Sequence, residues 1–143
     1  MKQRIVVFLL LAVIVLLSGC GAKSENKVTI DYGTSSIYTK EDMDAAISLI
    51  MKEFNTWKGC EYGELRFAGD EASSEENLAW LNEISDGADY TQCIKLLMDF
   101  RSPSAEEDLK GTAWEPDTEY TDYEWWLART DGGDWVIVTN GYQ

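Results

Sequence analysis

An apolar run at the start of the chain constrains the fold most, because it sets where folding can begin. Residues 5–17 are 13 consecutive apolar residues, and the charged side chains of Lys2 and Arg4 precede them. A helix that spans a bilayer needs roughly 20 apolar residues, so this run is too short for a membrane span. A basic start, a short apolar stretch and small residues after it are typical of an export signal. We therefore expect residues 1–19 to be a signal peptide that takes no part in the fold.

Small residues follow the apolar run and lead to a cysteine. The sequence Leu17-Ser18-Gly19-Cys20 resembles the lipobox that the lipoprotein signal peptidase recognises. That resemblance implies cleavage before Cys20 and a diacylglyceryl group on its thiol. Two acyl chains, each contributing about 0.8 kcal/mol per buried CH₂, give stable rather than marginal attachment. The expected location is the extracytoplasmic face of the cell membrane, with the membrane as a partner through the lipid on Cys20.

The remaining chain divides into a tether and one domain. Residues 20–27 comprise the lipidated cysteine and a polar stretch without apolar periodicity. Its seven residues after Cys20 reach at most about 25 Å when extended. Residues 28–143 are long enough to bury a single core. Their many aromatic residues argue against disorder, so we expect a single α+β domain over 28–143.

Charge and the absence of histidine narrow the function. Residues 1–19 hold two of the 12 basic residues and none of the 26 acidic ones, so 10 basic and 26 acidic residues remain, a net charge of −16. Binding to nucleic acid needs clustered Lys and Arg, and the basic residues of this sequence are not clustered. We therefore expect no nucleic-acid partner. The chain has no histidine, which removes the commonest general base and the imidazole ligands of transition metals. The acidic residues at 106–124 lack the spacing of a calcium loop. We therefore expect no cofactor, no metal site and no catalytic residue.

Hydrophobic periodicity predicts six elements in the order helix, strand, helix, strand, strand, strand. Thr39 is a typical N-cap, and apolar residues at three- and four-residue spacing follow it up to Trp57, before Gly59. A second helix is expected over about 74–86. Alternation predicts strands over 61–68, 93–100, 120–130 and 135–140. The expected fold is α+β: a long N-terminal helix packed on a curved, mainly antiparallel four-stranded sheet, with the second helix between strands 1 and 2, as in a cystatin-like or NTF2-like cone.

Three stretches resemble uncharacterised lipoproteins of gut clostridia, which are Gram-positive. They are Ile37-Tyr38-Thr39-Lys40-Glu41-Asp42, then Lys58-Gly59-Cys60, and the ending that runs from Trp125-Trp126-Leu127 through Gly133-Asp134-Trp135 to Asn140-Gly141-Tyr142. The resemblance covers most of the chain after Cys20. It implies a location and a domain of unknown function, and it carries no assigned chemistry.

Two further cysteines, Cys60 and Cys93, leave a disulfide open. An even pair in an exported protein can be oxidised. If the two strands that begin near these residues run parallel, their starts lie side by side and a bridge is feasible. If the strands run antiparallel, the thiols lie at opposite ends and no bridge can form. The sequence alone keeps both a disulfide and two separate thiols open.

An aromatic-rich region supplies the candidate binding residues, which are Trp114, Tyr123, Trp125 and Trp126. Strand alternation sends Tyr123 and Trp125 to one face and Trp126 to the other, so one set is expected to be more exposed. Exposed aromatic side chains beside acids could stack on a sugar ring or anchor a protein partner. Alternatively, these side chains fill the core.

The leading hypothesis is a non-enzymatic binding module for a protein partner or a small ligand. One alternative is a carboxylate-dependent enzyme acting on glycans, which needs two acids facing each other across a cleft. Glu64 and Asp99 are imaginable for that role, but strand alternation points both outward. The other alternative is a protective or inhibitory lipoprotein of the immunity type, since small acidic domains can mask basic surfaces.

Overall fold

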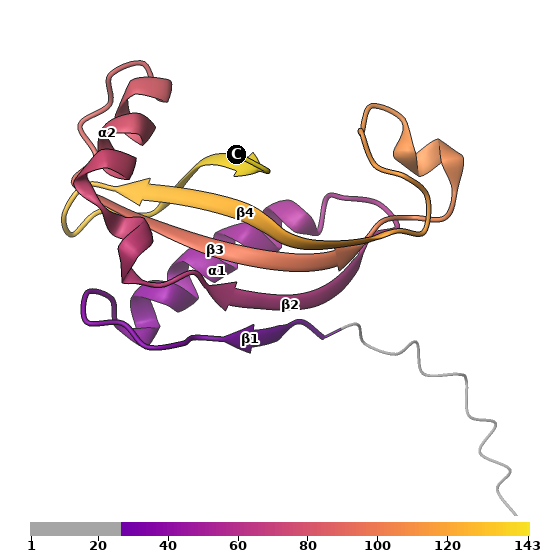
Figure 1. Ribbon diagram of the computed structural model, residues 1–143, viewed down its shortest axis with the longest axis horizontal. Helices are drawn as coiled ribbons and strands as arrows, with labels where there is room; N and C mark the ends of the chain where they lie inside the picture. The colour runs from indigo at the N-terminus through magenta and orange to yellow at the C-terminus, as the bar shows by residue number, and fades with distance from the viewer. Residues whose placement is uncertain (1–26) are drawn as a thin grey trace, which may run out of the picture.

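The computed structural model describes residues 27–143, which form a sheet with a helix on either side (Figure 1). The elements in chain order are β1 (Thr29–Asp31), α1 (Lys40–Phe54), β2 (Glu61–Phe67), the 3₁₀ turn η1 (Asp70–Ser73), α2 (Glu75–Ile84), β3 (Gln92–Arg101), the 3₁₀ turn η2 (Glu106–Leu109), β4 (Glu119–Arg129) and β5 (Val136–Gly141). The predicted signal peptide, Cys20 and the tether up to residue 26 lie outside the described residues. Within 27–143, no helix has the length and apolar character needed to cross a bilayer.

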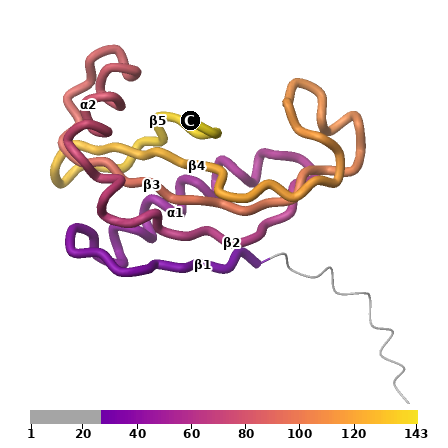
Figure 2. The backbone as a smooth tube through the Cα atoms, viewed as in Figure 1, coloured from indigo at the N-terminus to yellow at the C-terminus, as the bar shows by residue number. Residues whose placement is uncertain are grey.

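The five strands lie in the order in which they occur in the chain, β1-β2-β3-β4-β5 (Figure 2). β1 pairs with β2 in parallel, and every later pair is antiparallel. A parallel pair needs a long crossover, which α1 supplies. The result is a mixed sheet with one parallel edge.

Helix α1 forms and packs for reasons visible in its sequence. Thr39 and Asp42 make a reciprocal capping box, which confirms the predicted N-terminus. Its buried stripe, Met43, Ala46, Ile47, Ile50 and Phe54, packs on the inward residues of β2, β3 and β4 to form the main core. This face of the sheet is therefore closed along the length of α1.

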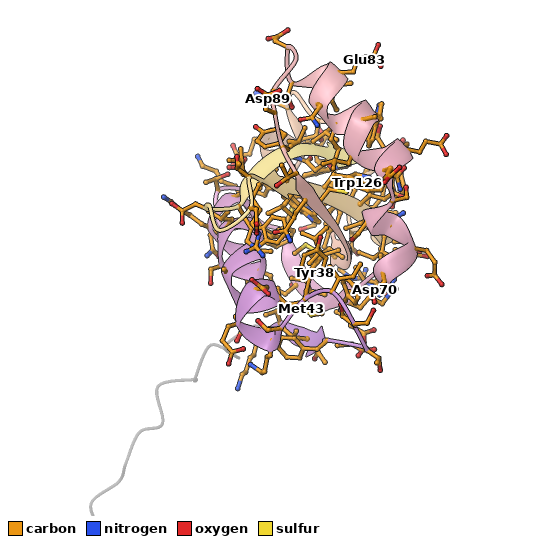
Figure 3. The ribbon with its side chains drawn as sticks, turned by 90° about the vertical axis from the view of Figure 1, so that its left-hand side faces the viewer. Tyr38, Met43, Asp70, Glu83, Asp89 and Trp126 are labelled. Carbon is orange, nitrogen blue, oxygen red and sulfur yellow. The ribbon has the colours of Figure 1, made fainter. Side chains whose placement is uncertain are left out.

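Helix α2 covers part of the opposite face of the sheet. The Ser74 hydroxyl accepts a hydrogen bond from the Asn77 N–H and caps its N-terminus. Below it lies a second, smaller core that includes Leu81, Cys93 and Trp126. Figure 3 shows Met43 on the α1 side of the sheet and Trp126 on the α2 side. Both faces are thus buried at the end of the sheet where α2 lies.

The predicted fold class is wrong in three respects. The sheet has five strands instead of four, it is mixed instead of mainly antiparallel, and α1 is a 15-residue second element instead of a long N-terminal helix. The error comes from β1, where the side chains of Val28, Ile30 and Tyr32 all pack on the main core. Their two-residue spacing is the strand signal, but it covers only three paired residues. A cystatin-like or NTF2-like cone is therefore not the architecture of this chain.

Candidate functional site

An open pocket of about 740 Å³ lies at the end of the sheet where α1 ends and β2 begins. Its walls come from the α1–β2 turn and from the long β3–β4 loop, with β4 and Tyr142, the residue before the last, completing the lining. Five aromatic side chains line it: Trp57, Trp114, Tyr120, Tyr123 and Tyr142. Its volume is within the range of about 300–1,000 Å³ that is typical of small-molecule sites.

The first wall depends on a glycine after α1. Gly59 has φ of +71°, and a Cβ at this position would lie 2.7 Å from Cβ of Pro103. Only glycine tolerates both the left-handed backbone and this contact. The turn that carries Trp57 and Lys58 is therefore packed directly against the base of the β3–β4 loop, and the two walls meet there.

The second wall is held by the buried hydroxyl of Ser102. Its Oγ donates to the Glu115 carbonyl at 2.6 Å and accepts from the Thr118 N–H at 2.9 Å. The Ser102 N–H donates to the Thr118 carbonyl, and the Asp117 N–H donates to the Pro103 carbonyl. These bonds close residues 102–118 into a loop whose two ends are fixed, so Trp114 projects from an anchored support.

The floor of the pocket is a set of packed aromatic rings. The ring centroids of Trp57 and Trp114 are 5.0 Å apart, and Trp57 stacks on Trp125 at 5.3 Å. Phe100 lies behind Trp114 at 5.2 Å. Edge-to-face and offset contacts of this kind favour fixed ring positions. The pocket is therefore preformed by its own core.

The tyrosine hydroxyls at the pocket are each tied to a protein group. Tyr123 donates to Asn140 Oδ1 at 2.8 Å, Tyr142 donates to the Thr121 carbonyl at 2.9 Å, and Tyr120 accepts from the Glu115 N–H at 2.8 Å. Burial raises the pKa of Tyr123 and of Tyr142 above the ordinary value of 10.0. All three rings are thus held in place, and Tyr123 and Tyr142 stay neutral near pH 7.

The rim carries two positive and two negative side chains, Lys58, Lys110, Glu107 and Asp108. Within residues 27–143, none of the four belongs to an ion pair. Lys40, Arg66, Lys95, Arg101 and Arg129, by contrast, all pair with carboxylates of the described chain. The rim can therefore offer both donors and acceptors to a ligand without first breaking a salt bridge.

The structure brings together two of the four predicted binding residues. Trp114 and Tyr123 line the pocket. Trp125 is fully buried behind Trp57, and Trp126 is buried under α2 against Trp80. Trp57, Tyr120, Tyr142 and the charged rim were missed as site residues. Trp57 continues the apolar spacing of α1, so only its place beyond the last helical residue distinguishes it from the core.

Cys60 and Cys93 are both free thiols, at opposite ends of the antiparallel pair β2–β3. Glu61, next to Cys60, pairs with Arg101 at one end of β3, whereas Cys93 lies at the other. Burial raises the pKa of each thiol to about 11, with the charge of Asp108 adding to the effect at Cys60. Neither cysteine is therefore an activated nucleophile near neutral pH.

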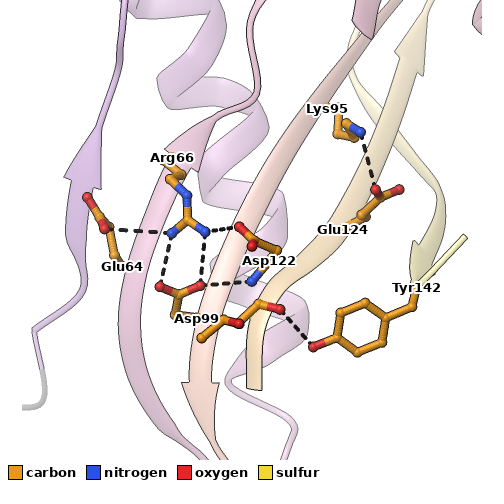
Figure 4. A network of polar contacts seen from close by, with 8 residues as sticks. Glu64, Arg66, Lys95, Asp99, Asp122, Glu124 and Tyr142 are labelled. Carbon is orange, nitrogen blue, oxygen red and sulfur yellow. Dashed lines mark hydrogen bonds and ion pairs between the residues drawn. The ribbon is translucent and has the colours of Figure 1, made fainter. Parts of the chain in front are cut away.

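The outer face of the sheet carries an ionic network (Figure 4). Arg66 binds Asp99 through two hydrogen bonds of 3.0 and 3.1 Å and also pairs with Asp122. The Asp122 N–H donates to Asp99 Oδ1 at 2.9 Å, beside the irregular pairing of β3 with β4. Glu64 completes the group at 3.6 Å from Arg66. Glu64 and Asp99 face outward, as alternation predicts, and together with Arg66 and Asp122 they link β2, β3 and β4.

This network makes stability depend on pH. Burial opposes ionisation of Asp99, but hydrogen bonds from Arg66 and the Asp122 N–H outweigh it, so its pKa lies below the ordinary value of 3.8. A carboxyl with a lowered folded-state pKa stabilises the fold above its unfolded-state pKa and loses that contribution as pH falls through the folded-state pKa. We expect the free energy of unfolding, measured with urea, to fall below about pH 4.

The variant Asp99→Asn removes the carboxylate charge and so tests how much that charge contributes to stability. It should lose about 1–2 kcal/mol at pH 7, because it leaves Arg66 without its best partner, and its stability should vary less with pH than that of the wild type. Equal slopes in the two proteins below about pH 4 would contradict the assignment.

The carboxyl groups with displaced pKa values all lie outside the pocket. Four aspartates have displaced pKa values, Asp42, Asp44, Asp70 and Asp99, and all four shifts are downward. None of these four lines the pocket. A carboxylic acid that donates a proton needs the opposite shift. Within the described part of the chain, no group of three or more His, Cys, Asp or Glu residues could hold a metal ion.

Comparison with protein-family models, with curated proteins and with solved structures finds no match to this chain.

Proposed function

We propose that this chain is a lipid-anchored binding protein of the extracytoplasmic membrane face, and that its aromatic pocket holds a neutral saccharide. The observation that carries the proposal is the pocket itself, about 740 Å³ with five aromatic side chains and a rim of four charges that form no ion pair within residues 27–143. The lipobox at residues 17–20 supports the location. A flat patch for a protein partner has less support, because Trp125 and Trp126 are buried.

The aromatic floor suits a ring with apolar C–H faces. The π-face of an aromatic ring is electronegative, so it attracts the weakly positive hydrogens on the flat side of a sugar. Trp57 and Trp114 present two adjoining rings, 5.0 Å apart and inclined by 50°. Their packing on Phe100 and Trp125 fixes these rings before a ligand arrives, which lowers the entropy lost on binding.

The rim selects against strongly charged ligands. An anion would meet Glu107, Asp108 and the field of a chain whose residues 20–143 carry a net charge of −16. That field attracts a cation to the domain, but at the pocket the cation would meet the ammonium groups of Lys58 and Lys110. Sugar hydroxyls both donate and accept, so they can use the ammonium and carboxylate groups together. A neutral polyhydroxylated ligand is therefore the class that satisfies the whole rim.

Titration with soluble probes tests this function. We expect at least one of chitotriose, cellotriose and maltotriose to bind and to change the tryptophan fluorescence, with choline and trigalacturonate binding more weakly. Trp114→Ala should weaken that binding by about tenfold or more, about 1.4 kcal/mol, because it removes half of the stacking surface.

The matched control is Trp80→Ala, since Trp80 packs on Trp126 at the other end of the molecule. This variant should keep the wild-type affinity for the trisaccharide. The proposal fails if no neutral trisaccharide binds the wild-type protein, if choline or trigalacturonate binds more tightly, or if the two tryptophan variants lose affinity equally.

A further inference from the structure

The described chain enters the fold at the same end of the sheet as the pocket. β1 runs parallel to β2, with Thr29 beside Glu64, so both strands start at this end. The pocket residues Thr56, Trp57 and Lys58 immediately precede β2. Figures 1 and 2 show the start of β1, the α1–β2 turn and the β3–β4 loop together at the right-hand end of the molecule.

The opposite end holds α2 and the β4–β5 turn. The register places Cys93 beside Ala128 and Ala128 beside Val136, so this turn lies at the far end of β3 from Arg101. The ten residues of β3 span roughly 33 Å. The two ends of the domain are thus separated by more than the reach of the tether.

A short tether fixes which end faces the bilayer. Residues 21–27 reach at most about 25 Å from the lipid on Cys20, and they join the domain at the pocket end. The acidic domain is repelled by anionic headgroups, which disfavours lying flat on the surface. The pocket end should therefore be the end nearest the membrane, with α2 pointing away from it.

From this geometry we infer that the pocket takes its saccharide from the membrane surface, as a sugar group carried by a lipid or a membrane-anchored glycan. The inference rests on the proposed function for the ligand class and for the anchor. Two groups confined to one bilayer meet at a raised effective concentration. A pocket held next to the bilayer gains that advantage, whereas a pocket at the α2 end would lie beyond the reach of surface sugars.

The first experiment measures orientation without any sugar. The full chain, lipidated and reconstituted in phosphatidylcholine vesicles, carries Cys60→Ser and one new surface cysteine, either Ser104→Cys in the β3–β4 loop or Asp134→Cys in the β4–β5 turn. A fluorophore on that cysteine transfers energy to an acceptor on the lipid headgroups. Transfer from position 104 should be about twofold higher or more, given the length of the sheet. Equal transfer, or higher transfer from position 134, overturns the orientation.

The second experiment separates the sources of the sugar. The trisaccharide that binds best in solution is offered to the anchored protein in three forms: free, coupled to phosphatidylethanolamine in the same vesicles, or coupled in separate vesicles. We expect half-saturation in the same vesicles at a bulk concentration about tenfold lower than for the free sugar, and no gain in separate vesicles. A conjugate that binds no better than the free sugar overturns the inference but leaves the proposed function intact. A lack of binding to the free sugars in solution counts against the proposed function, and the orientation result stands apart from it.

Discussion

Replacing Trp125 with alanine should lower the free energy of unfolding by about 3–5 kcal/mol, the range observed when a large buried aromatic residue is truncated. Trp125 is fully buried, and its ring stacks on Trp57 and packs on Tyr123 at 6.0 Å. The cavity left behind would be bounded by other aromatic rings, which cannot collapse into it without losing their own contacts. Urea unfolding followed by circular dichroism measures the change.

The conservative variant Trp125→Phe separates packing from polarity. The Trp125 Nε1 is buried and has no hydrogen-bond partner within the described chain, so its burial carries a desolvation cost that phenylalanine does not have. We expect this variant to lose about 1–2 kcal/mol, less than a cavity of the same size would cost elsewhere. If both variants lost the same amount, the aromatic packing assigned to Trp125 would be wrong.

Gly63→Ala should cost about 3 kcal/mol through a clash with the backbone of the next strand. A Cβ at Gly63 would lie 2.6 Å from the Asp99 carbonyl oxygen and 3.0 Å from its carbonyl carbon. The contact falls where the pairing of β2 with β3 shifts register between Tyr62 and Leu65. No side-chain rotation can relieve a contact with backbone atoms, so the two strands must separate. Thermal and urea unfolding measure the loss.

Gly111→Ala is the matched control for this effect. A Cβ there meets nothing within 4 Å, but φ is +84°, so its cost of about 1–2 kcal/mol is purely conformational. Gly63 has an ordinary φ, and its cost is purely steric. A Gly63 variant as stable as wild type would show that β2 and β3 lie further apart than the register indicates.

Long, strongly periodic segments could be predicted from the sequence, and the short edge strand could not. The Thr39 capping box and the apolar stripe of α1 encode that helix locally. The alternation in β3 and β4 is also local. β1 offers three paired residues, and its parallel pairing with β2 depends on the crossover by α1, which no local pattern reports. Because the prediction lacked β1, it described the sheet as mainly antiparallel and placed the helix before the first strand.

Only two of the four predicted binding residues line the pocket, because sequence patterns report local structure and not how elements cover one another. Alternation predicted that one of Trp125 and Trp126 would be exposed, because the rule assumes a sheet with one solvated face. α2 covers the other face at that end, so both tryptophans are buried. Trp114 and Tyr123 could be predicted because they belong to the aromatic-rich region of the sequence. The charged rim could not be recognised, since Lys58 and Asp108 come together only where Gly59 meets Pro103.

The parallel pairing of β1 also decides how the domain would bear a mechanical load. A pull on the chain before Lys27 would act along β1 and would be directed out of the domain at the pocket end, because β1 starts there. In a parallel pair pulled along the strand, the hydrogen bonds that join β1 to β2 are sheared together instead of being opened one at a time. The packing of Val28, Ile30 and Tyr32 on the core resists the same displacement. β1, the shortest of the five strands, is thus arranged to resist a force that is applied through the chain before Lys27.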